Sequence, residues 1–352
     1  MGDRKIKVLV VDDSALFRKV VTDILTSDPL IEVVGTANNG KSALFKNDKL
    51  NPDIITMDIE MPIMDGLESL KNIIRTNPKP VIMMSVLTQH GAEATFKALE
   101  YGAVDFIPKP SSDFIISVDD IAELLITKVK SVYQSKVRIP SMGDRDDERE
   151  KGSEVSAEEI TVTESSRVIG IGTSTGGPSA LMTVFKGFPR ELPSPVLVVQ
   201  HMPEGFTSAF AERLNSNCSL NVKEGADGDI LYPGWGYVAP GNCHMAVEER
   251  GTKKQLRVYK GDKVSGHMPS IDVLFNSIAE YCGQDAIAVI MTGMGRDGAK
   301  GIFEIKKRGG YTIAQNEETS VVYGMNRVAV EMGAVSTVSS LYDIPRRIVE
   351  HL

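Results

Sequence analysis

The chain has 352 residues, of which 42% are hydrophobic and 24% are charged, and its formal net charge is −8. This length predicts two or three domains of ordinary soluble composition. The negative charge argues against a nucleic-acid partner, and apolar runs no longer than a strand argue against insertion into a membrane. Three scattered cysteines and an N-terminus without a long apolar core predict reduced thiols in a cytoplasmic protein.

The first third of the chain alternates between strand-like and helix-like patterns. Five nearly continuous apolar strands, each followed by an amphipathic helix, predict a doubly wound five-stranded parallel sheet in a domain of residues 1–133. Strands are expected at residues 7–11, 32–37, 53–57, 80–85 and 104–107, and helices near 14–27, 40–49, 66–76, 90–101 and 118–133.

Polar residues follow the carboxyl ends of these predicted strands, which right-handed crossovers bring to one rim of the sheet. Three carboxylates on one rim repel each other unless a hard cation such as Mg²⁺ lies among them, and a lysine with a hydroxyl would hold phosphoryl oxygens. The pattern predicts phosphoryl transfer onto the third strand's aspartate. Taken singly, each residue could be a solvated strand end. The residues are Asp12, Asp13, Asp58, Ser85 and Lys109.

The same region resembles the receiver domain of bacterial response regulators. The similarity rests on VLVVDDSALFRKVVTDIL, DIITMDIEMPIMDGLESL, VIMMSVLT and YGAVDFIPKP, and it extends from residue 5 to about 125. It implies a histidine kinase as phosphodonor, phosphorylation of Asp58, and Mg²⁺ held by Asp12, Asp13 and Asp58. It also implies phosphoryl contacts from Ser85 and Lys109, a coupling role for Phe106, and a cis bond between Lys109 and Pro110.

Between the domains the pattern disappears. Residues 134–166 are rich in charge and serine and poor in large apolar side chains. Such a segment buries too little surface to offset its ordering entropy, so we expect a flexible charged linker there.

A glycine-rich turn follows an apolar run at the start of the remaining sequence, residues 167–352. Gly172-Thr173-Ser174-Thr175-Gly176 fits the G-x-S-x-G pattern of a serine nucleophile on a turn between strand and helix. A dinucleotide-binding loop is an alternative, but its third glycine would fall on Thr175. A purely structural glycine turn also stays open.

The rest of this region predicts a mostly parallel α/β domain. Strands are expected at 168–171, 196–200, 286–291 and 311–315, with a short one near 220–223. Residues 228–261 alternate β-formers with glycine and proline, which favours an insertion of antiparallel hairpins. Helices are expected at 206–215, 271–281 and 298–307, after the serine turn, and from about residue 341.

Two further residues complete a candidate triad with Ser174. His201 ends the run PVLVVQ, so it shares the serine's rim and could accept its proton, although a structural histidine is an alternative. Asp297 follows AIAVIMTGMGR and could orient the imidazole, or it could cap a helix opening at Gly298. The loop before it has backbone N–H groups suited to an oxyanion site.

This second region resembles the protein-glutamate methylesterases of bacterial chemotaxis, on GIGTSTGGPSAL, VLVVQHMPEGF, GWGYVAPGN, MPSIDVLFNSIA, VIMTGMGRDGA and AQNEETSVVYGMN. The resemblance implies hydrolysis of methyl-glutamyl esters on chemoreceptors, without an esterase cofactor, and in many members deamidation of receptor glutamines. Ser174 would be the nucleophile, His201 the base and Asp297 the orienting acid, with Met294 N–H at the oxyanion and Thr175 nearby. A transcriptional regulator would need a basic output domain, and an inactive hydrolase-like scaffold stays open.

Overall fold

The computed structural model of the chain describes residues 4–86, 88–110, 117–135, 167–251 and 253–352. The chain divides into two compact units, residues 1–151 and 152–352. Of the linker predicted at 134–166, only the first two residues are described, and they end a helix. The other residues of that prediction lie outside the described part.

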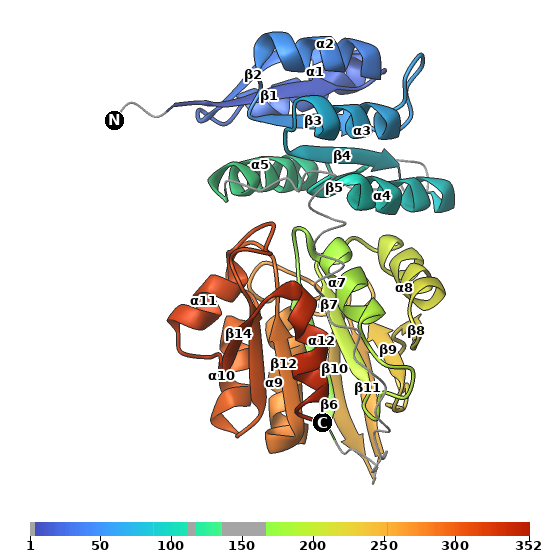
Figure 1. The fold of residues 1–352 in the computed structure, drawn as a ribbon, viewed down its shortest axis with the longest axis vertical. Coiled ribbons are helices and arrows are strands. Elements are labelled where there is room, and N and C mark those ends of the chain that lie inside the picture. Colours follow the sequence, from blue (N-terminus) through green and yellow to red (C-terminus); the bar gives the residue numbers. More distant parts are fainter. Residues whose placement is uncertain (1–3, 87, 111–116, 136–166, 252) are drawn as a thin grey trace. The chain divides into compact units, whose positions relative to one another are not determined.

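The first unit is a five-stranded parallel sheet in the order β2-β1-β3-β4-β5 (Figure 1). The predicted doubly wound receiver fold is confirmed, with strand ends within one or two residues of those expected. Its strands are β1 (Ile6–Val11), β2 (Ile31–Ala37), β3 (Ile54–Asp58), β4 (Val81–Val86) and β5 (Asp105–Lys109). Its helices are α1 (Ala15–Thr26), α2 (Gly40–Leu50), α3 (Gly66–Thr76), α4 (Gln89–Tyr101) and α5 (Val118–Gln134).

Side-chain caps fix where these helices begin. Ser14 accepts a hydrogen bond from the backbone of Phe17 at the start of α1, and Asp65 does the same at α3. Each cap satisfies a backbone N–H that has no partner within its helix. Helix α1 packs against α5, whereas α3 packs between α2 and α4, so helices cover both faces of the sheet.

The second unit is built on a seven-stranded parallel sheet in the order β14-β13-β12-β6-β7-β9-β8 (Figure 1). Its strands are β6 (Val168–Thr173), β7 (Val196–Gln200), β8 (Asn221–Glu224), β9 (Trp235–Val238), β12 (Ala286–Ile290), β13 (Tyr311–Gln315) and β14 (Thr337–Ser339). An antiparallel hairpin of β10 (His244–Arg250) and β11 (Lys253–Tyr259) is inserted after β9. The mostly parallel fold with a hairpin insertion is therefore confirmed.

The helices of the second unit connect these strands. They are α7 (Gly177–Lys186), α8 (Phe206–Asn217), α9 (Ile271–Cys282), α10 (Ala299–Lys307), α11 (Met325–Glu331) and α12 (Ile344–Val349), with short 3₁₀ turns η1 (Gly283–Asp285) and η2 (Leu341–Asp343). Helix α10 packs with both α9 and α11, and α7 packs with α8 and α12. None of the described helices combines the length and apolarity needed to cross a membrane.

Three details differ from the sequence prediction. β9 was expected within the antiparallel hairpins but pairs in parallel with β7 and β8, because residues 225–234 carry the chain back to the start of the sheet. Composition predicts a strand there but not its direction. Helix α11 and strand β14 were not predicted. The only cis peptide bond among the described residues joins Met268 to Pro269, so the expected cis bond before Pro110 is not present.

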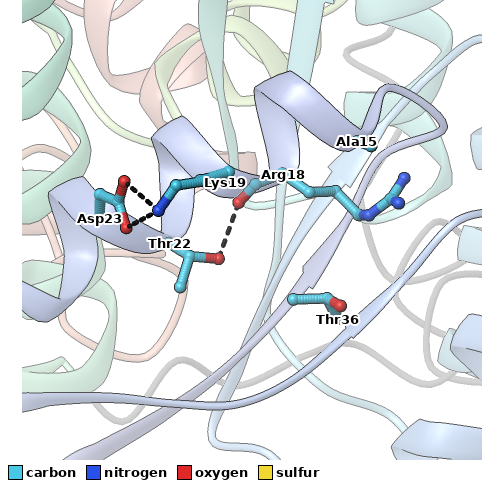
Figure 2. Close-up of a pocket in the computed structure, with 6 residues that line it drawn as sticks. All are labelled: Ala15, Arg18, Lys19, Thr22, Asp23 and Thr36. Carbon is cyan, nitrogen blue, oxygen red and sulfur yellow. Dashed lines mark hydrogen bonds and ion pairs between the residues drawn. The ribbon is translucent and has the colours of Figure 1, made fainter.

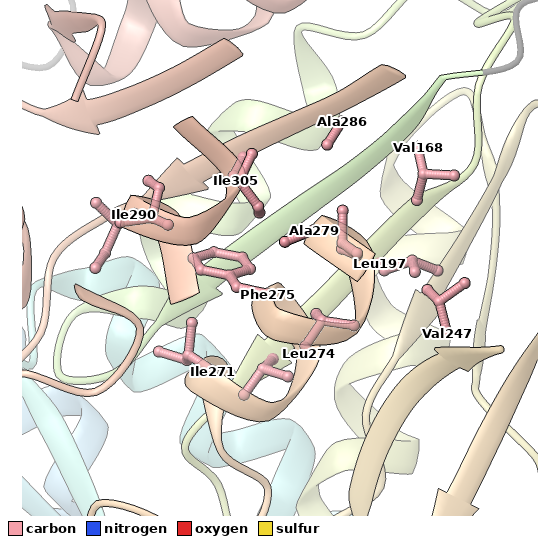
Figure 3. Close-up of a cluster of buried hydrophobic side chains, with 14 of the residues drawn as sticks. Val168, Leu197, Val247, Ile271, Leu274, Phe275, Ala279, Ala286, Ile290 and Ile305 are labelled. Carbon is pink, nitrogen blue, oxygen red and sulfur yellow. The ribbon is translucent and has the colours of Figure 1, made fainter. Parts of the chain in front are cut away.

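The core of the second unit lies between the sheet and helix α9. Ile271, Leu274, Phe275 and Ile278 are fully buried along α9, at the i, i+3, i+4, i+7 spacing of an apolar helix face. They pack on the sheet and on the hairpin, as Figure 3 shows for the side chains around Phe275. This packing fixes the N-terminus of α9 near the carboxyl ends of the central strands β12, β6 and β7.

Candidate functional sites

The first candidate site lies at the carboxyl rim of the five-stranded sheet. Asp58 is the last residue of β3, and Asp12 and Asp13 follow β1 directly. Each of the three carboxylates has an oxygen within 4.8 Å of the others. Asp12 and Asp58 are buried, whereas Asp13 is exposed. The structure thus brings together the three residues predicted to hold Mg²⁺.

Lys109 is the only cation that pairs with these carboxylates among the described residues. Its Nζ lies 2.5 Å from Asp12 Oδ2 and 2.8 Å from Asp58 Oδ2, and it also lies 4.7 Å from the centre of the Phe17 ring. Burial raises the pKa of Asp58 to about 6, although the charge of Lys109 opposes this shift. One lysine therefore does not compensate for the carboxylates.

The carboxylate cluster fits a divalent cation. Asp12 Oδ2 is buried and accepts no hydrogen bond of good geometry, despite the nearby lysine. An oxygen-only donor set with one exposed carboxylate suits Mg²⁺, which usually keeps several waters. A cavity of about 290 Å³ adjoins the cluster and is lined by Asp13, Asp58, Ser85 and Lys109.

Of the two other predicted receiver residues, Ser85 lines the cavity beside the carboxylates and Phe106 does not. Ser85 lines this cavity, and its hydroxyl donates to the Gly91 carbonyl at 3.2 Å. Thr95 Oγ1 in turn donates to Ser85 Oγ at 2.7 Å. Phe106 is buried in β5 and is not among the residues that line the cavity. A coupling role for Phe106 would act through packing.

Arg18 is a residue that the sequence analysis missed. Its Nη1 donates to the carbonyl oxygens of Asp12 and Asp13, at 2.7 and 2.9 Å, and so fixes the loop that carries both carboxylates. Arg18 also lines a second, shallow cavity beside α1, where Lys19 pairs with Asp23 (Figure 2). The sequence signal was a basic residue one turn into a helix, which is common on solvated faces.

The second candidate site lies at the carboxyl rim of the seven-stranded sheet, around the turn from β6 into α7. Ser174 follows β6 and is half-buried. Gly176 adopts a φ of +77°, a conformation that glycine accepts without strain. A Cβ on Gly177 would lie 1.9 Å from Gln200 Oε1. Glycine is therefore favoured at position 176 by the backbone conformation and at position 177 by the lack of space, as expected for the sharp turn of a G-x-S-x-G pattern.

His201 and Asp297 form a direct side-chain contact at this site. His201 Nε2 lies 2.8 Å from Asp297 Oδ2, and both side chains are almost completely buried. Because a carboxylate only accepts hydrogen bonds, the neutral imidazole carries its proton on Nε2 and leaves Nδ1 as the basic atom. Nδ1 is buried and has no hydrogen-bond partner.

Asp297 also receives three hydrogen bonds from the start of α9. Ser270 Oγ, Ile271 N and Asp272 N donate to it at 2.8, 2.7 and 3.1 Å. Burial alone would raise the pKa of Asp297, but the His201 contact and these donors together lower it. The alternative that Asp297 caps the helix opening at Gly298 is wrong, because α10 begins at Ala299 with Gly298 as its N-cap residue and no side-chain cap.

Ser174 and His201 are neighbours through the backbone. Thr173 and Gln200, the residues before them, are paired across β6 and β7, and His201 N donates to the Thr173 carbonyl at 3.1 Å. The Gln200 side chain spans the two loops, since its Nε2 donates at 3.0 Å to the carbonyls of both Ser174 and His201. No hydrogen bond joins the serine hydroxyl to the imidazole in this structure.

The loop after β12 forms the third side of the site. Ser174 N donates to the Thr292 carbonyl at 3.0 Å, and a Cβ on Gly293 would lie 2.7 Å from Ser174 Cβ. The next residue, Met294, is 37% exposed beside the serine. Thr175 is buried, and its carbonyl accepts a hydrogen bond from Thr292 Oγ1 at 2.9 Å. Gln200 and Thr292 were not identified from sequence, which offered no signal for these braces.

Comparison with known proteins assigns a family to each unit. Residues 169–348 match the family model of the CheB methylesterase, and residues 8–117 match that of the response regulator receiver domain. A protein-glutamate methylesterase/protein-glutamine glutaminase of Pyrococcus abyssi is 47% identical, over 98% of this chain and 93% of its own length. One of Halalkalibacterium halodurans is 46% identical, over 99% and 98%.

A solved structure agrees with this assignment. The crystal structure of the Thermotoga maritima CheB methylesterase catalytic domain is 41% identical in sequence and superposes with a TM-score of 0.52. It covers 53% of this chain and 98% of the Thermotoga domain. The chain therefore belongs to the CheB methylesterase family, in the form that begins with a response regulator receiver domain.

Proposed function

We propose that the second unit hydrolyses methyl esters of glutamate side chains on methyl-accepting chemoreceptors, which restores glutamate and releases methanol. The observation that carries this proposal is the His201–Asp297 contact of 2.8 Å, which leaves a basic ring nitrogen unpaired next to the loop of Ser174. The relatives' name supports the substrate class. Removal of receptor methyl groups would provide chemotactic adaptation.

The reaction proceeds in two acyl-transfer steps. Ser174 Oγ attacks the ester carbonyl carbon while His201 Nδ1 takes the hydroxyl proton, and Asp297 keeps the imidazole in the correct tautomer. The imidazolium returns the proton to the methoxide, which leaves as methanol. Water then attacks the acyl-serine by the same route and releases glutamate. A glutamine side chain would follow the same path and release ammonia, which is the deamidation that the relatives' name includes.

The developing oxyanion needs donors beside Ser174. We assign this role to the backbone N–H of Met294, because Gly293 lies against the serine and places the following peptide at the same edge. Thr175 helps to hold the turn in place, because its carbonyl accepts a hydrogen bond from Thr292 Oγ1.

The receiver would control this activity through phosphorylation of Asp58 by a chemotaxis histidine kinase. Asp12, Asp13 and Asp58 would hold Mg²⁺, which neutralises phosphoryl oxygens when bound. Lys109 and Ser85 would contact those oxygens, and Phe106 would transmit the change through the packing around β5. The full-length Asp58→Asn variant should stay at basal activity when a phosphodonor and Mg²⁺ are added, whereas the wild type should be stimulated.

The decisive experiment measures labelled methanol released from a methylated receptor. Ser174→Ala should reduce the rate by roughly 10⁶-fold, as loss of the nucleophile does in other triads. Ser216→Ala is a matched control, since this serine is exposed on α8 and bonds only within that helix. Methanol release by Ser174→Ala at a tenth of the wild-type rate would contradict the proposal. Absence of release by the wild type would favour an inactive scaffold.

A further inference from the structure

A second histidine lies flat against His201. The rings of His201 and His267 are 3.8 Å apart at their centres, and their planes differ by 13°. The sequence favoured His201 over His267, because His267 lies shortly before Pro269, where a histidine could be an ordinary polar surface residue.

A short hairpin holds His267 in this place. Val264 and His267 exchange two backbone hydrogen bonds of 3.0 and 2.9 Å, and the two residues between them, Ser265 and Gly266, have φ values of +53° and +83°. These are the features of a tight type I′ turn. Ser265 Oγ also donates to Asp272 Oδ2, at 3.3 Å, which ties the turn to the first turn of α9.

The stacked geometry limits what His267 can do. The N–H groups and lone pairs of an imidazole lie in the plane of its ring, so two stacked rings cannot donate hydrogen bonds to each other. For the same reason they cannot share a metal ion through their nitrogen atoms. His267 therefore acts on His201 through its face and not through proton transfer.

We propose that His267 is a positioning residue that holds the imidazole of His201 in its reactive orientation, an inference that rests on the proposed function. His201 has one hydrogen bond, at Nε2, and its Nδ1 has no partner. A ring fixed at one edge can still swing about that contact. The flat face of His267 blocks this motion on one side and keeps Nδ1 in place for the serine proton.

The test compares flat and non-flat replacements in the full-length protein. His267→Phe keeps an aromatic face, whereas His267→Leu fills similar space without one. We expect His267→Leu to lower kcat about tenfold, equivalent to about 1.4 kcal/mol of transition-state free energy, with KM unchanged. His267→Phe should retain near wild-type kcat. His267→Ala provides a second non-flat variant if the leucine disturbs the hairpin.

The chain offers a matched control in another stacked histidine. His351 stacks on Tyr311 at 3.5 Å, at the start of β13 and so at the opposite end of the sheet. His351→Leu should leave kcat unchanged, so a loss confined to position 267 reports the position and not the loss of any stack.

Three outcomes would overturn the inference. Wild-type kcat in both His267→Leu and His267→Ala would show that the stack is dispensable. Equal losses in His267→Phe and His267→Leu would indicate a role for the ring nitrogens. A higher KM with normal kcat would indicate a substrate contact. In the same assay, full activity of Ser174→Ala would instead reject the proposed function, so the two failures are distinguishable.

Discussion

Replacement of Asp297 by asparagine separates the two tasks that this carboxylate performs. Its four donors divide evenly, because Oδ2 accepts from His201 and Ile271 while Oδ1 accepts from Ser270 and Asp272. Asparagine keeps one oxygen and places an NH₂ group where the other was. If the NH₂ group replaces Oδ2, the Ile271 N–H loses its acceptor, and if it replaces Oδ1, the Asp272 N–H does. The other partner can accept instead in each case, because the His201 ring can change tautomer and the Ser270 hydroxyl can rotate.

The expected losses are large in both rate and stability. An unsatisfied buried donor costs roughly 1–3 kcal/mol, so the one orphaned N–H should lower the unfolding free energy of the second unit by about that amount. If the amide NH₂ faces His201, the imidazole is driven into the wrong tautomer, and the rate should fall by about 10⁴-fold, as in comparable triads.

Two measurements check this prediction. The chain has a single tryptophan, Trp235 in β9, so its fluorescence reports unfolding of the second unit alone. Methanol release gives the rate. Asp272→Asn is the control for stability, because burial raises the pKa of Asp272 and removal of its charge should not lower the unfolding midpoint.

The pH dependence gives an independent check. The pKa of Asp297 is lowered in the folded protein, so its contribution is complete above the ordinary carboxyl pKa of about 3.9 and is lost as the pH falls through the lowered value. The stability gap between wild type and Asp297→Asn should shrink over that acidic range. A folded variant that keeps a tenth of the wild-type kcat would refute the orienting role.

Three further substitutions test other parts of the structure. Gly177→Ala should displace the Gln200 amide and so lower both kcat and the unfolding free energy followed by Trp fluorescence, the latter by about 1–3 kcal/mol. Unchanged values would contradict the close approach of Gln200 Oε1 to position 177. Ile63 has a φ of +72° and is 81% exposed, so Ile63→Asn should stabilise the first unit by about 1 kcal/mol, measured by amide hydrogen exchange in its sheet. Phe17→Leu removes the ring beside Lys109 and its cation–π interaction of about 1 kcal/mol, so it should slow phosphorylation by a small-molecule phosphodonor. Phe17→Tyr keeps the ring and should not.

The sequence predicted the strands and the rims well, because buried parallel strands are continuous apolar runs and their ends carry the polar residues. Ser174, His201 and Asp297 could be proposed because each directly follows a predicted strand or its loop. The contacts that hold these three residues in place could not be predicted. Gln200 lies 26 positions after Ser174, and His267 lies 66 positions after His201, so their contacts join separate segments of the chain and no local pattern encodes them.

The direction of β9 shows the same limit. A short strand of WGYV carries the same pattern whether its neighbour runs with it or against it, so only the path of residues 225–234 decides the pairing. Likewise, Asp297 next to Gly298 suggested a local cap, whereas the donors that it accepts lie about 26 positions earlier, at the start of α9. Capping rules consider only residues next to a helix end, so they do not predict partners that are distant in the sequence.

The Gln200 amide, which joins the loops of Ser174 and His201, makes the site sensitive to chemical degradation of one side chain. Gln200 uses its amide nitrogen as a donor to two carbonyl oxygens, and its own oxygen accepts from Thr173 Oγ1 at 2.6 Å. Spontaneous conversion of this side chain to glutamate would replace the donor by a carboxylate oxygen, which can only accept and would repel both carbonyls. Gln200 is 3% exposed, so burial shields it from the water that this conversion consumes. Chemical damage at this one amide would therefore disable the enzyme without touching a reacting atom.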